Sequence, residues 1–292
     1  MPLWIYFCFL NLFTGLNDAN QSWNRSKREA VTLQPYNYRT LGRFGQRNWR
    51  THYPKCGLNN QSPIDIDLKQ VKPGDFPTNL RTTNIDTKPL EIEIRNNGYT
   101  ALVKYFWPCC PPKIYGGPLT DVYEFVGLHF HWGTDDKSGT EHSVDGQHGA
   151  MEAHMIFKNE RYESKEKALD HNDGLTVFAC RFKCDPTAPP FNLLEGVRLV
   201  SKWGDTAKSF YPDTVPLTEL IGSPDFHYAF YHGGLTTPPC SESVQWIVNL
   251  NLIPMNCSQL NYLRAMKDKR ELEISGNFRE IQKLNNRSVF IS

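Results

Sequence analysis

Two histidines, His129 and His131, stand two positions apart in the segment Leu128-His129-Phe130-His131-Trp132-Gly133. In a β-strand such residues point to the same face, with roughly 7 Å between their Cα atoms. Two imidazoles placed in this way can bind one metal ion at about 2.0–2.1 Å each, and His154 could add a third nitrogen from a neighbouring strand. Three histidines with an open fourth position are the ligands of a catalytic rather than a structural zinc site. An isolated His-x-His pair is weak evidence, because most such pairs are ordinary surface residues of a strand.

Several other motifs accompany these histidines, and together they resemble the α-class carbonic anhydrases. The resemblance extends from about residue 49 to residue 289, and the motifs keep the family's order and spacing. It implies a single domain around a large twisted β-sheet with zinc at the bottom of a conical cleft, and reversible hydration of carbon dioxide to bicarbonate and a proton. The matching segments are Gln61-Ser62-Pro63-Ile64-Asp65-Ile66, Asn96-Asn97-Gly98, His129-Phe130-His131-Trp132-Gly133, Glu141-His142, Glu152-Ala153-His154, Leu235-Thr236-Thr237-Pro238-Pro239, Asn277-Phe278-Arg279 and Gln282.

The resemblance also implies which residues bind the metal. His129, His131 and His154 look like the three ligands of a Zn²⁺ ion, and the fourth ligand would be a water whose pKa zinc lowers from 15.7 to about 7. The resulting hydroxide is the nucleophile that carbon dioxide requires. Glu152, two residues before His154 and on the same strand face, resembles the carboxylate that fixes the tautomer of that ligand. The alternative is a solvated strand carboxylate.

Two further residues resemble the group that orients the zinc hydroxide. Thr236 matches the family's gatekeeper, whose hydroxyl accepts from the hydroxide and donates to a carboxylate, and Glu141 matches that carboxylate. Because carbon dioxide has no dipole, its site needs an apolar wall, and Thr237 is expected to border the substrate site. The residues that match this wall, and that without the motifs would be taken as core packing, are Ile156, Val177, Leu235, Val244 and Trp246.

Tyr99 stands just after the Asn-Gly turn, at the position where the fastest family members carry a proton-shuttling histidine. Tyrosine, with a free pKa near 10, is a poor proton carrier at neutral pH. Without a shuttle, a donor with a pKa near 7 loses protons to water at only about 10³ s⁻¹, whereas the fastest carbonic anhydrases approach about 10⁶ s⁻¹. We therefore predict an active enzyme that is limited by proton transfer and accelerated by imidazole-type buffers.

Gly127 is a second departure from the family pattern. The family commonly has Gln there, two residues before the first ligand, where it accepts a hydrogen bond from that imidazole. Glycine has no side chain to do this, and losing such a partner typically costs about 10- to 100-fold in metal affinity or activity. We expect zinc to be retained more weakly under chelators than in relatives with Gln. Leu102, where the family cleft is often polar, also changes the water network.

The N-terminus and the cysteine content indicate export. Residues 3–13 form an apolar run too short to span a bilayer, which is typical of a secretory signal peptide ending near residue 19; a buried N-terminal strand is the alternative. The basic stretch Arg25-Ser26-Lys27-Arg28 is a candidate processing site, so residues 20–28 are a possible pro-segment before a catalytic domain over residues 30–292. Eight cysteines suit an oxidising compartment. We predict a secreted, extracellular protein without a membrane span.

The cysteines cannot all pair within the mature chain. Cys8 would leave with the signal peptide, and seven would remain, so at least one thiol is free or bridges to another chain. By resemblance, Cys56 and Cys240 match the positions bridged in secreted and membrane-anchored family members. Cys180 and Cys184, on one extended strand, would lie about 13 Å apart, too far to join. The pairing stays open for Cys109, Cys110, Cys180, Cys184 and Cys257.

Composition and patterning favour a β-rich domain. Lys and Arg total 32 against 31 Asp and Glu, so the basic excess usual in nucleic-acid-binding proteins is missing. Strands are predicted at residues 90–94, 128–132, 153–157, 175–182 and 244–252, and helices at residues 191–203 and from a cap at Ser258 to Met266. The predicted fold class is mostly β (α+β): a single domain around a large twisted, mainly antiparallel sheet with a few peripheral short helices.

The main rival function is a non-catalytic carbonic-anhydrase-like binding or extracellular matrix protein. Such proteins usually lose a ligand histidine, whereas this chain keeps all three together with Thr236 and Glu141. We expect a small-molecule substrate, carbon dioxide or bicarbonate, and no nucleic-acid partner; protein partners stay open. Of five Asn-x-Ser sequons, at Asn20, Asn24, Asn60, Asn256 and Asn286, the last two are the better glycan acceptors.

Overall fold

The computed structural model describes residues 36–222 and 226–292, and all of these belong to one compact unit that begins at Tyr36. The predicted signal peptide, the predicted pro-segment and the sequons at Asn20 and Asn24 lie outside the described residues. Within those residues, no helix has both the length and the apolar composition that crossing a bilayer requires.

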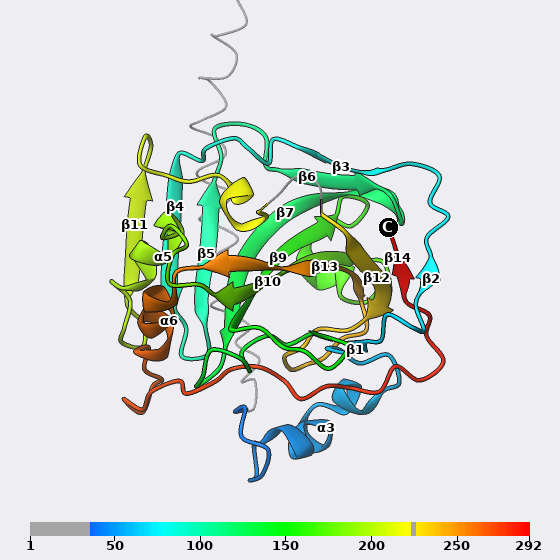
Figure 1. The fold of residues 1–292 in the computed structure, drawn as a ribbon, viewed down its shortest axis with the longest axis horizontal. Coiled ribbons are helices and arrows are strands. Elements are labelled where there is room, and N and C mark those ends of the chain that lie inside the picture. The colour runs from blue at the N-terminus through cyan, green and yellow to red at the C-terminus, as the bar shows by residue number, and fades with distance from the viewer. Residues whose placement is uncertain (1–35, 223–225) are drawn as a thin grey trace, which may run out of the picture. The chain divides into compact units, whose positions relative to one another are not determined.

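Twelve strands form one large twisted sheet (Figure 1). Its main path runs β11-β4-β5-β7-β9-β10-β13-β12-β14-β2, and β6 pairs with β7 and β3. Only β10 with β13 and β14 with β2 run parallel, so the prediction of a mainly antiparallel sheet is confirmed. The strands are β2 (Lys72–Pro73), β3 (Leu80–Thr83), β4 (Glu91–Asn96), β5 (Ala101–Phe106), β6 (Lys113–Gly116), β7 (Leu119–Trp132), β9 (Met151–Asn159), β10 (Leu175–Cys184), β11 (Thr206–Phe210), β12 (Tyr228–Gly233), β13 (Val244–Met255) and β14 (Phe290–Ile291), with β1 (Asp65–Ile66) and β8 (Ser143–Val144) as a separate parallel pair.

Burial along the strands shows where the sheet is covered. The peripheral strand β4 alternates, burying Ile92 and Ile94 between more exposed residues, as expected for a sheet covered on one face. The central strands β9 and β10 are buried along almost their whole length, because apolar residues pack on both of their faces. One face packs against α5 and α6, and the other holds the three histidines and an apolar cluster around Trp246.

The helices are few and short, as predicted, but their limits differ from the prediction. They are η1 (Gln46–Asn48), α3 (Trp49–His52), η2 (Pro54–Gly57), α4 (Lys165–Ala168), α5 (Asn192–Val197), η3 (Leu217–Leu220) and α6 (Cys257–Arg264). The helix predicted over residues 191–203 ends at Val197. Beyond it the chain makes other hydrogen bonds: the Ser201 carbonyl accepts from Lys267 N and Asn96 Nδ2.

The prediction that Ser258 caps the last helix was wrong. The helix α6 begins at Cys257, and Asn256 is its cap, because its side-chain Oδ1 accepts a hydrogen bond from the Ser258 backbone N–H at 3.0 Å. Asparagine is as good a capping residue as serine, so sequence preference alone did not separate the two. The Asn256 amide also donates to the Ala188 carbonyl at 3.0 Å.

Two disulfides tie the fold together. The predicted Cys56–Cys240 bridge is confirmed, with 4.8 Å between its Cα atoms. A second bridge, Cys184–Cys257, links the end of β10 to the start of α6 and resolves a pairing that the sequence left open. Cys180 and Cys184 are not joined, as expected from their spacing. Cys180 is buried in β10, and Cys109 lies exposed in the loop after β5.

Candidate metal and active site

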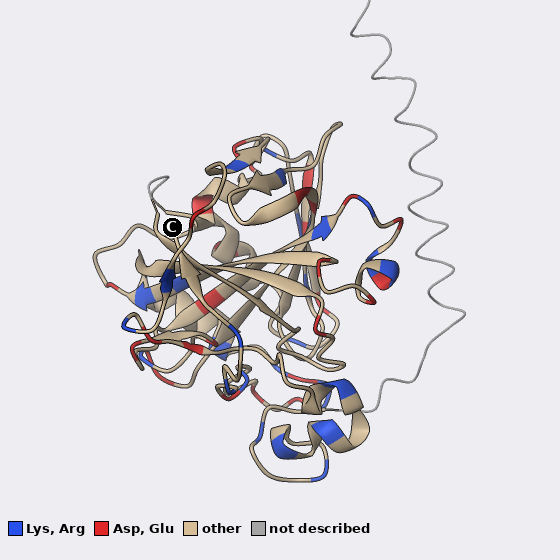
Figure 2. Cartoon of the chain, turned by 90° about the vertical axis from the view of Figure 1, so that its right-hand side faces the viewer, with Lys and Arg blue, Asp and Glu red and all other residues tan. Residues whose placement is uncertain are grey.

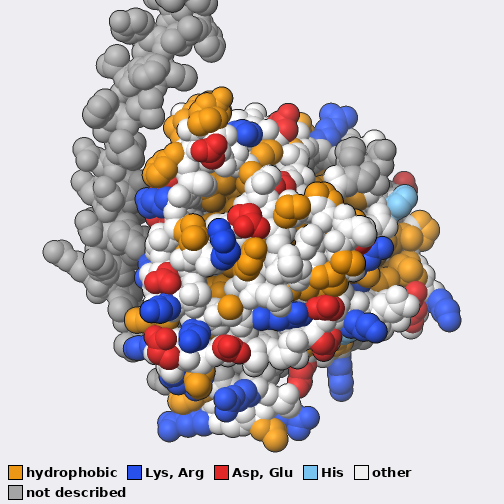
Figure 3. Space-filling view, turned by 60° about the vertical axis from the view of Figure 1, so that its left-hand side comes forward, with side chains coloured by type: hydrophobic (Ala, Val, Ile, Leu, Met, Phe, Trp, Pro, Cys, Tyr) orange, Lys and Arg blue, Asp and Glu red, His pale blue; other side chains and the backbone are white. Residues whose placement is uncertain are grey.

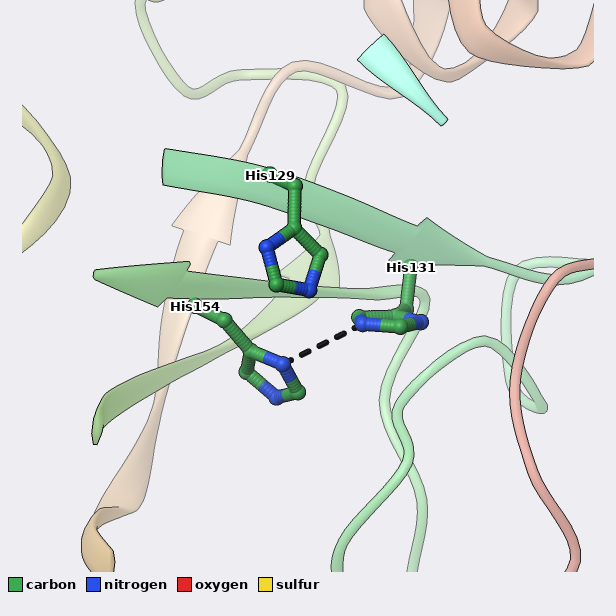
Figure 4. Close-up of side chains that lie close together, drawn as sticks. All are labelled: His129, His131 and His154. Atoms are coloured by element: carbon green, nitrogen blue, oxygen red, sulfur yellow. Dashed lines mark hydrogen bonds between the residues drawn. The ribbon is translucent and has the colours of Figure 1, made fainter. Parts of the chain in front are cut away.

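The register of two antiparallel strands brings the three histidines together. His129 of β7 lies directly opposite His154 of β9, and His131 lies opposite Glu152. Because residues two apart share a face, all three imidazoles project from the same side of the sheet (Figure 4). One ring nitrogen from each lies within 4.8 Å of the other two. The structure therefore confirms the predicted arrangement, in which two of the histidines lie on one strand and the third lies on the neighbouring strand.

In two of the rings, the outer nitrogen, which faces away from the other two histidines, lies next to a hydrogen-bond acceptor. His131 Nδ1 lies 2.7 Å from the Asn277 carbonyl oxygen, and His154 Nε2 lies 2.7 Å from Glu152 Oε1. Both acceptors require a proton on the outer nitrogen, so we infer that His131 Nε2 and His154 Nδ1 carry lone pairs. These two atoms face each other at 3.1 Å. Two nitrogens bound tetrahedrally to one zinc ion would lie about 3.3 Å apart.

A carboxylate oxygen adds to the same cluster of acceptors. Glu141 Oε1 accepts from the Arg279 backbone N–H at 2.8 Å, but the buried Oε2 has no full hydrogen bond within the described chain. It lies 3.4 Å from His131 Nε2. Lone pairs this close repel one another, and only a proton or a cation among them removes the repulsion.

Burial keeps these imidazoles neutral. Burial is the largest effect on all three: it lowers the pKa of His131 to about 3, and it lowers the pKa of His129 and His154 too. Neutral imidazole is the ligand form of histidine. The residues present therefore fit a divalent cation better than a shared proton.

A buried polar chain begins at the third histidine. Burial alone would raise the pKa of Glu152, but His142 and His154 hold it well below its usual value. Its Oε1 lies 2.6 Å from His142 Nδ1, and its Oε2 accepts from the His142 backbone N–H at 2.8 Å. His142 Nε2 then lies 2.7 Å from the Tyr231 hydroxyl, which donates to Ser62 Oγ at 2.9 Å.

The last link of this chain is the loop after β12. Ser62 Oγ accepts from the Gly234 backbone N–H at 3.2 Å. His142 is thus a buried residue with a partner at each ring nitrogen. Neither Tyr231 nor Ser62 was singled out from the sequence, although Ser62 lies inside one of the matching motifs. A hydroxyl in a run of apolar strand residues is the signal that could have drawn attention to Tyr231.

Comparison with known proteins agrees with this geometry. The sequence model of the family described as eukaryotic-type carbonic anhydrase matches residues 44–292. The chain belongs to the eukaryotic-type carbonic anhydrase family. Among its relatives, mouse (Mus musculus) carbonic anhydrase 6 is 33% identical over 285 residues, covering 95% of this chain and 83% of that protein. Human (Homo sapiens) carbonic anhydrase 6 is 30% identical, covering 85% and 80%. Mouse carbonic anhydrase 1 is 32% identical, covering 84% and 94%.

Thr236, which matches the family's gatekeeper by resemblance, lies beside Glu141. Burial, followed by the charge of Glu152, raises the pKa of Glu141 well above its usual value, and the Thr236 hydroxyl opposes this rise. Three constraints fix the loop that carries Thr236. The Leu235 backbone N–H donates to the Ser241 carbonyl, Trp246 Nε1 donates to the Gly234 carbonyl, and the Cys56–Cys240 disulfide anchors its far end.

The sheet register also assembles the predicted apolar wall. Ile156, Val177 and Trp246 pair in one row across β9, β10 and β13, two residues along from His154 and therefore on its face. They belong to one buried cluster with Val244, and the partly buried Leu235 packs against that cluster. Thr237 lies in the same loop as Thr236, and its carbonyl accepts from the Cys240 backbone N–H.

Tyr99 and Gly127 are the two residues that the sequence analysis set apart from the family pattern, and the structure shows their surroundings. The ring of Tyr99 stacks on that of Tyr36, with 4.3 Å between centroids, and burial raises the pKa of Tyr99. The ring of His129 makes no hydrogen bond within the described part of the chain, in keeping with Gly127 on the same face. A Cβ atom at Gly127 would meet only the Val103 carbonyl, at 3.7 Å. Leu102 lies directly opposite His129 in β5.

Two residues of the motif near the C-terminus position the site. Asn277 accepts from His131 through its carbonyl, and its side-chain oxygen accepts from the Trp132 backbone N–H at 2.7 Å. Arg279 supplies the backbone N–H that Glu141 accepts, and its guanidinium donates to the Ser62 carbonyl at 2.8 Å. The family resemblance implied no role for either residue.

Proposed function

We propose that the protein catalyses the zinc-dependent, reversible hydration of carbon dioxide to bicarbonate and a proton. The observation that carries the proposal is the convergence of three neutral imidazoles, from His129, His131 and His154, on one point beside Glu141. When bound, a zinc ion supplies a nucleophile at neutral pH by lowering the pKa of a water molecule to about 7. The family membership supports this reaction class.

Thr236 and Glu141 are proposed to orient the attacking oxygen. Glu141 Oε1 already accepts a hydrogen bond from the Arg279 backbone N–H. In its charged form, Glu141 can therefore accept a hydrogen bond from the Thr236 hydroxyl on Oε2. Thr236 then has only its oxygen lone pairs left to offer, so it accepts a hydrogen bond from the attacking group. This arrangement selects for ligands that can donate a proton at that position.

The apolar wall is proposed to hold carbon dioxide against this oxygen. Ile156, Val177, Leu235, Val244 and Trp246 offer a dry surface to a substrate that has no dipole, and Thr237 borders it. Glu152 is proposed to keep the proton of His154 on Nε2, so that Nδ1 remains a ligand. Tyr99 is a weak proton carrier in this scheme, since its raised pKa keeps the phenol protonated at neutral pH.

Zinc content and stopped-flow hydration test the proposal. We expect one zinc per chain and hydration that falls at least about 1,000-fold in His154→Ala, which removes a ligand. His171→Ala, at an exposed position next to α4, is the matched control and should keep both. Full hydration by metal-free protein would refute the role of zinc. A zinc-loaded parent without hydration would favour the non-catalytic binding or matrix function.

Secretion and glycosylation belong to the same proposal. Two disulfides within the described residues support an oxidising, extracellular location. Asn286 is exposed, whereas the Asn256 amide is engaged with Ala188, so we propose Asn286 as the main glycan acceptor. Expression of the full chain in animal cells, followed by N-terminal sequencing and glycan mapping of the medium, tests each point. Retention in the cytosol would contradict the proposed location.

A further inference from the structure

The positive charge of the chain is concentrated near its N-terminal side. The basic lobe, defined as residues 36–58, contains no Asp or Glu. Residues 65–292 carry 24 Lys and Arg against 29 Asp and Glu, so a lobe of charge +5 precedes a segment of charge −5. Figure 2 marks the lobe's basic segments in blue. Its cations are Arg39, Arg43, Arg47, Arg50 and Lys55.

These cations make few contacts with the rest of the fold: Lys55 Nζ donates to Ser241 Oγ at 3.5 Å, and the Arg43 guanidinium lies 5.3 Å from the centroid of the Phe44 ring. All five are exposed, and none makes an ion pair among the described residues, whereas Lys208, Arg161 and Arg264 elsewhere do. The lobe is anchored by other means: Trp49 is buried, and Cys56 is bridged to Cys240. In Figure 3, basic side chains gather at the lower end of the molecule, where α3 lies in Figure 1, and the two charges mix above it.

The lobe borders a groove that is itself basic. The groove has a volume of about 650 Å³, and Arg47, Arg50 and Lys283 line it together with neutral polar residues and the exposed apolar side chains of Leu58 and Ile281. Glu280 is the one acidic side chain that lines it, and its Oε1 accepts a hydrogen bond from the Thr40 hydroxyl at 2.8 Å. In the floor, the Arg279 guanidinium is already bound to Gln61 Oε1 and the Ser62 carbonyl. The positive charge that remains available to a ligand is therefore that of Arg47, Arg50 and Lys283.

We propose that the groove and the basic lobe bind a sulfated polysaccharide chain. Arginine offers a planar set of donors that suits sulfate oxygens, and unpaired cations gain from a polyanion by releasing its counterions. A concave groove suits a linear chain better than a flat bilayer. Trp49 and Tyr53 are buried, and Tyr36 and Tyr38 are partly buried against Trp49, so the lobe offers little exposed indole or phenol face of the kind that stacks single-stranded bases. The biological setting rests on the proposed secretion, but the binding itself does not depend on catalysis.

Titration of the folded protein with heparin, a commercial sulfated polysaccharide, tests the proposal at several salt concentrations. We expect binding at 0.15 M salt that weakens with added salt. In the double variant Arg47→Gln/Arg50→Gln, affinity should fall at least about tenfold, and the slope of log K against log salt should become shallower by about 2. Lys137→Gln/Lys167→Gln removes the same charge at exposed positions outside the groove and should bind like the parent.

The controls distinguish a failure of polysaccharide binding from a failure of the proposed carbon dioxide hydration. Thermal unfolding and hydration should match the parent in both double variants, because neither touches the metal site. Chemically desulfated heparin should bind at least about tenfold more weakly than heparin. Equal losses in the two double variants would overturn the proposal, as would no binding at 0.15 M salt. Tighter binding to phosphatidylserine vesicles or to an acidic peptide than to heparin would overturn it too.

Discussion

Replacing Glu152 by glutamine should weaken metal binding through the tautomer of His154. Glu152 Oε1 accepts from His154 Nε2 at 2.7 Å and from His142 Nδ1 at 2.6 Å, and Oε2 accepts from the His142 backbone N–H at 2.8 Å. A carboxylate can satisfy all three donors because both of its oxygens are acceptors. A glutamine has one acceptor oxygen, so its NH₂ group must face either the two imidazoles or the backbone N–H.

Either orientation places a donor against a donor. If the amide NH₂ faces the imidazoles, His154 relieves the conflict by moving its proton to Nδ1, the atom that faces His131 Nε2 and would otherwise bind the metal. The loss of such a partner typically lowers metal affinity about 10- to 100-fold, or about 1.4–2.7 kcal/mol. If the NH₂ group faces the backbone, an unpaired buried N–H lowers the free energy of unfolding by about 1–3 kcal/mol.

Zinc competition against a chromophoric chelator measures the first effect, and urea unfolding of metal-free protein measures the second. Glu163→Gln removes the same charge from an exposed position and serves as the matched control. We expect the zinc dissociation constant to rise about 10- to 100-fold in Glu152→Gln and to stay unchanged in the control. A Glu152→Gln protein that binds zinc within twofold of the parent and also unfolds in urea like the parent would refute the inference that this carboxylate fixes the ligand tautomer.

Three other predictions follow from the same contacts. Gly127→Gln should supply the missing acceptor for His129 and slow zinc loss to a chelator by up to about tenfold; equal loss rates in parent and variant would contradict this. Tyr99→His should raise hydration in buffers that do not carry protons by about tenfold or more, since turnover without a shuttle is limited to about 10³ s⁻¹. Imidazole should accelerate the parent and Tyr99→Phe alike, and a parent turnover near 10⁶ s⁻¹ without such a buffer would rule out the proton-transfer limit. Replacing Cys56 and Cys240 together by serine opens a link between residues 184 positions apart and should lower the free energy of unfolding by about 3–5 kcal/mol in urea; a loss below about 1 kcal/mol would show that the bridge constrains little.

Local pattern was enough to predict five of the strands and the shared face of two histidines, but not the remaining strands of the sheet. The alternation of β-strand side chains places His129 and His131 together wherever that strand lies in the sheet. The position of the third histidine depends on which strand pairs with β7. That strand is β9, which begins at Met151, whereas β7 ends at Trp132. Only the family resemblance placed His154 beside them. Residues such as Tyr231 act through contacts between distant segments, so no local pattern marks them.

The same reasoning explains what the sequence left open. Cys184 meets Cys257 because the parallel register of β10 and β13 sets Cys184 opposite Met255, two residues before its partner. That register is a property of the folded sheet and has no local signal in either segment. Beyond the end of α5, the Ser201 carbonyl accepts hydrogen bonds from Lys267 N and Asn96 Nδ2. Both donors lie in distant segments, so these contacts have no local signal either.

The buried polar chain gives His154 and the loop that carries Thr236 a common support. Each member is hydrogen-bonded to the next, from His154 through Glu152, His142 and Tyr231 to Ser62, which holds the loop at Gly234. A half-satisfied buried network is costly, so a change at one end is felt by groups at the other. This chain therefore adds to the Leu235–Ser241 and Trp246–Gly234 hydrogen bonds and the Cys56–Cys240 disulfide in setting the position of Thr236 relative to the three imidazoles. Small shifts in the loop and in the ligand tautomer should occur together rather than independently.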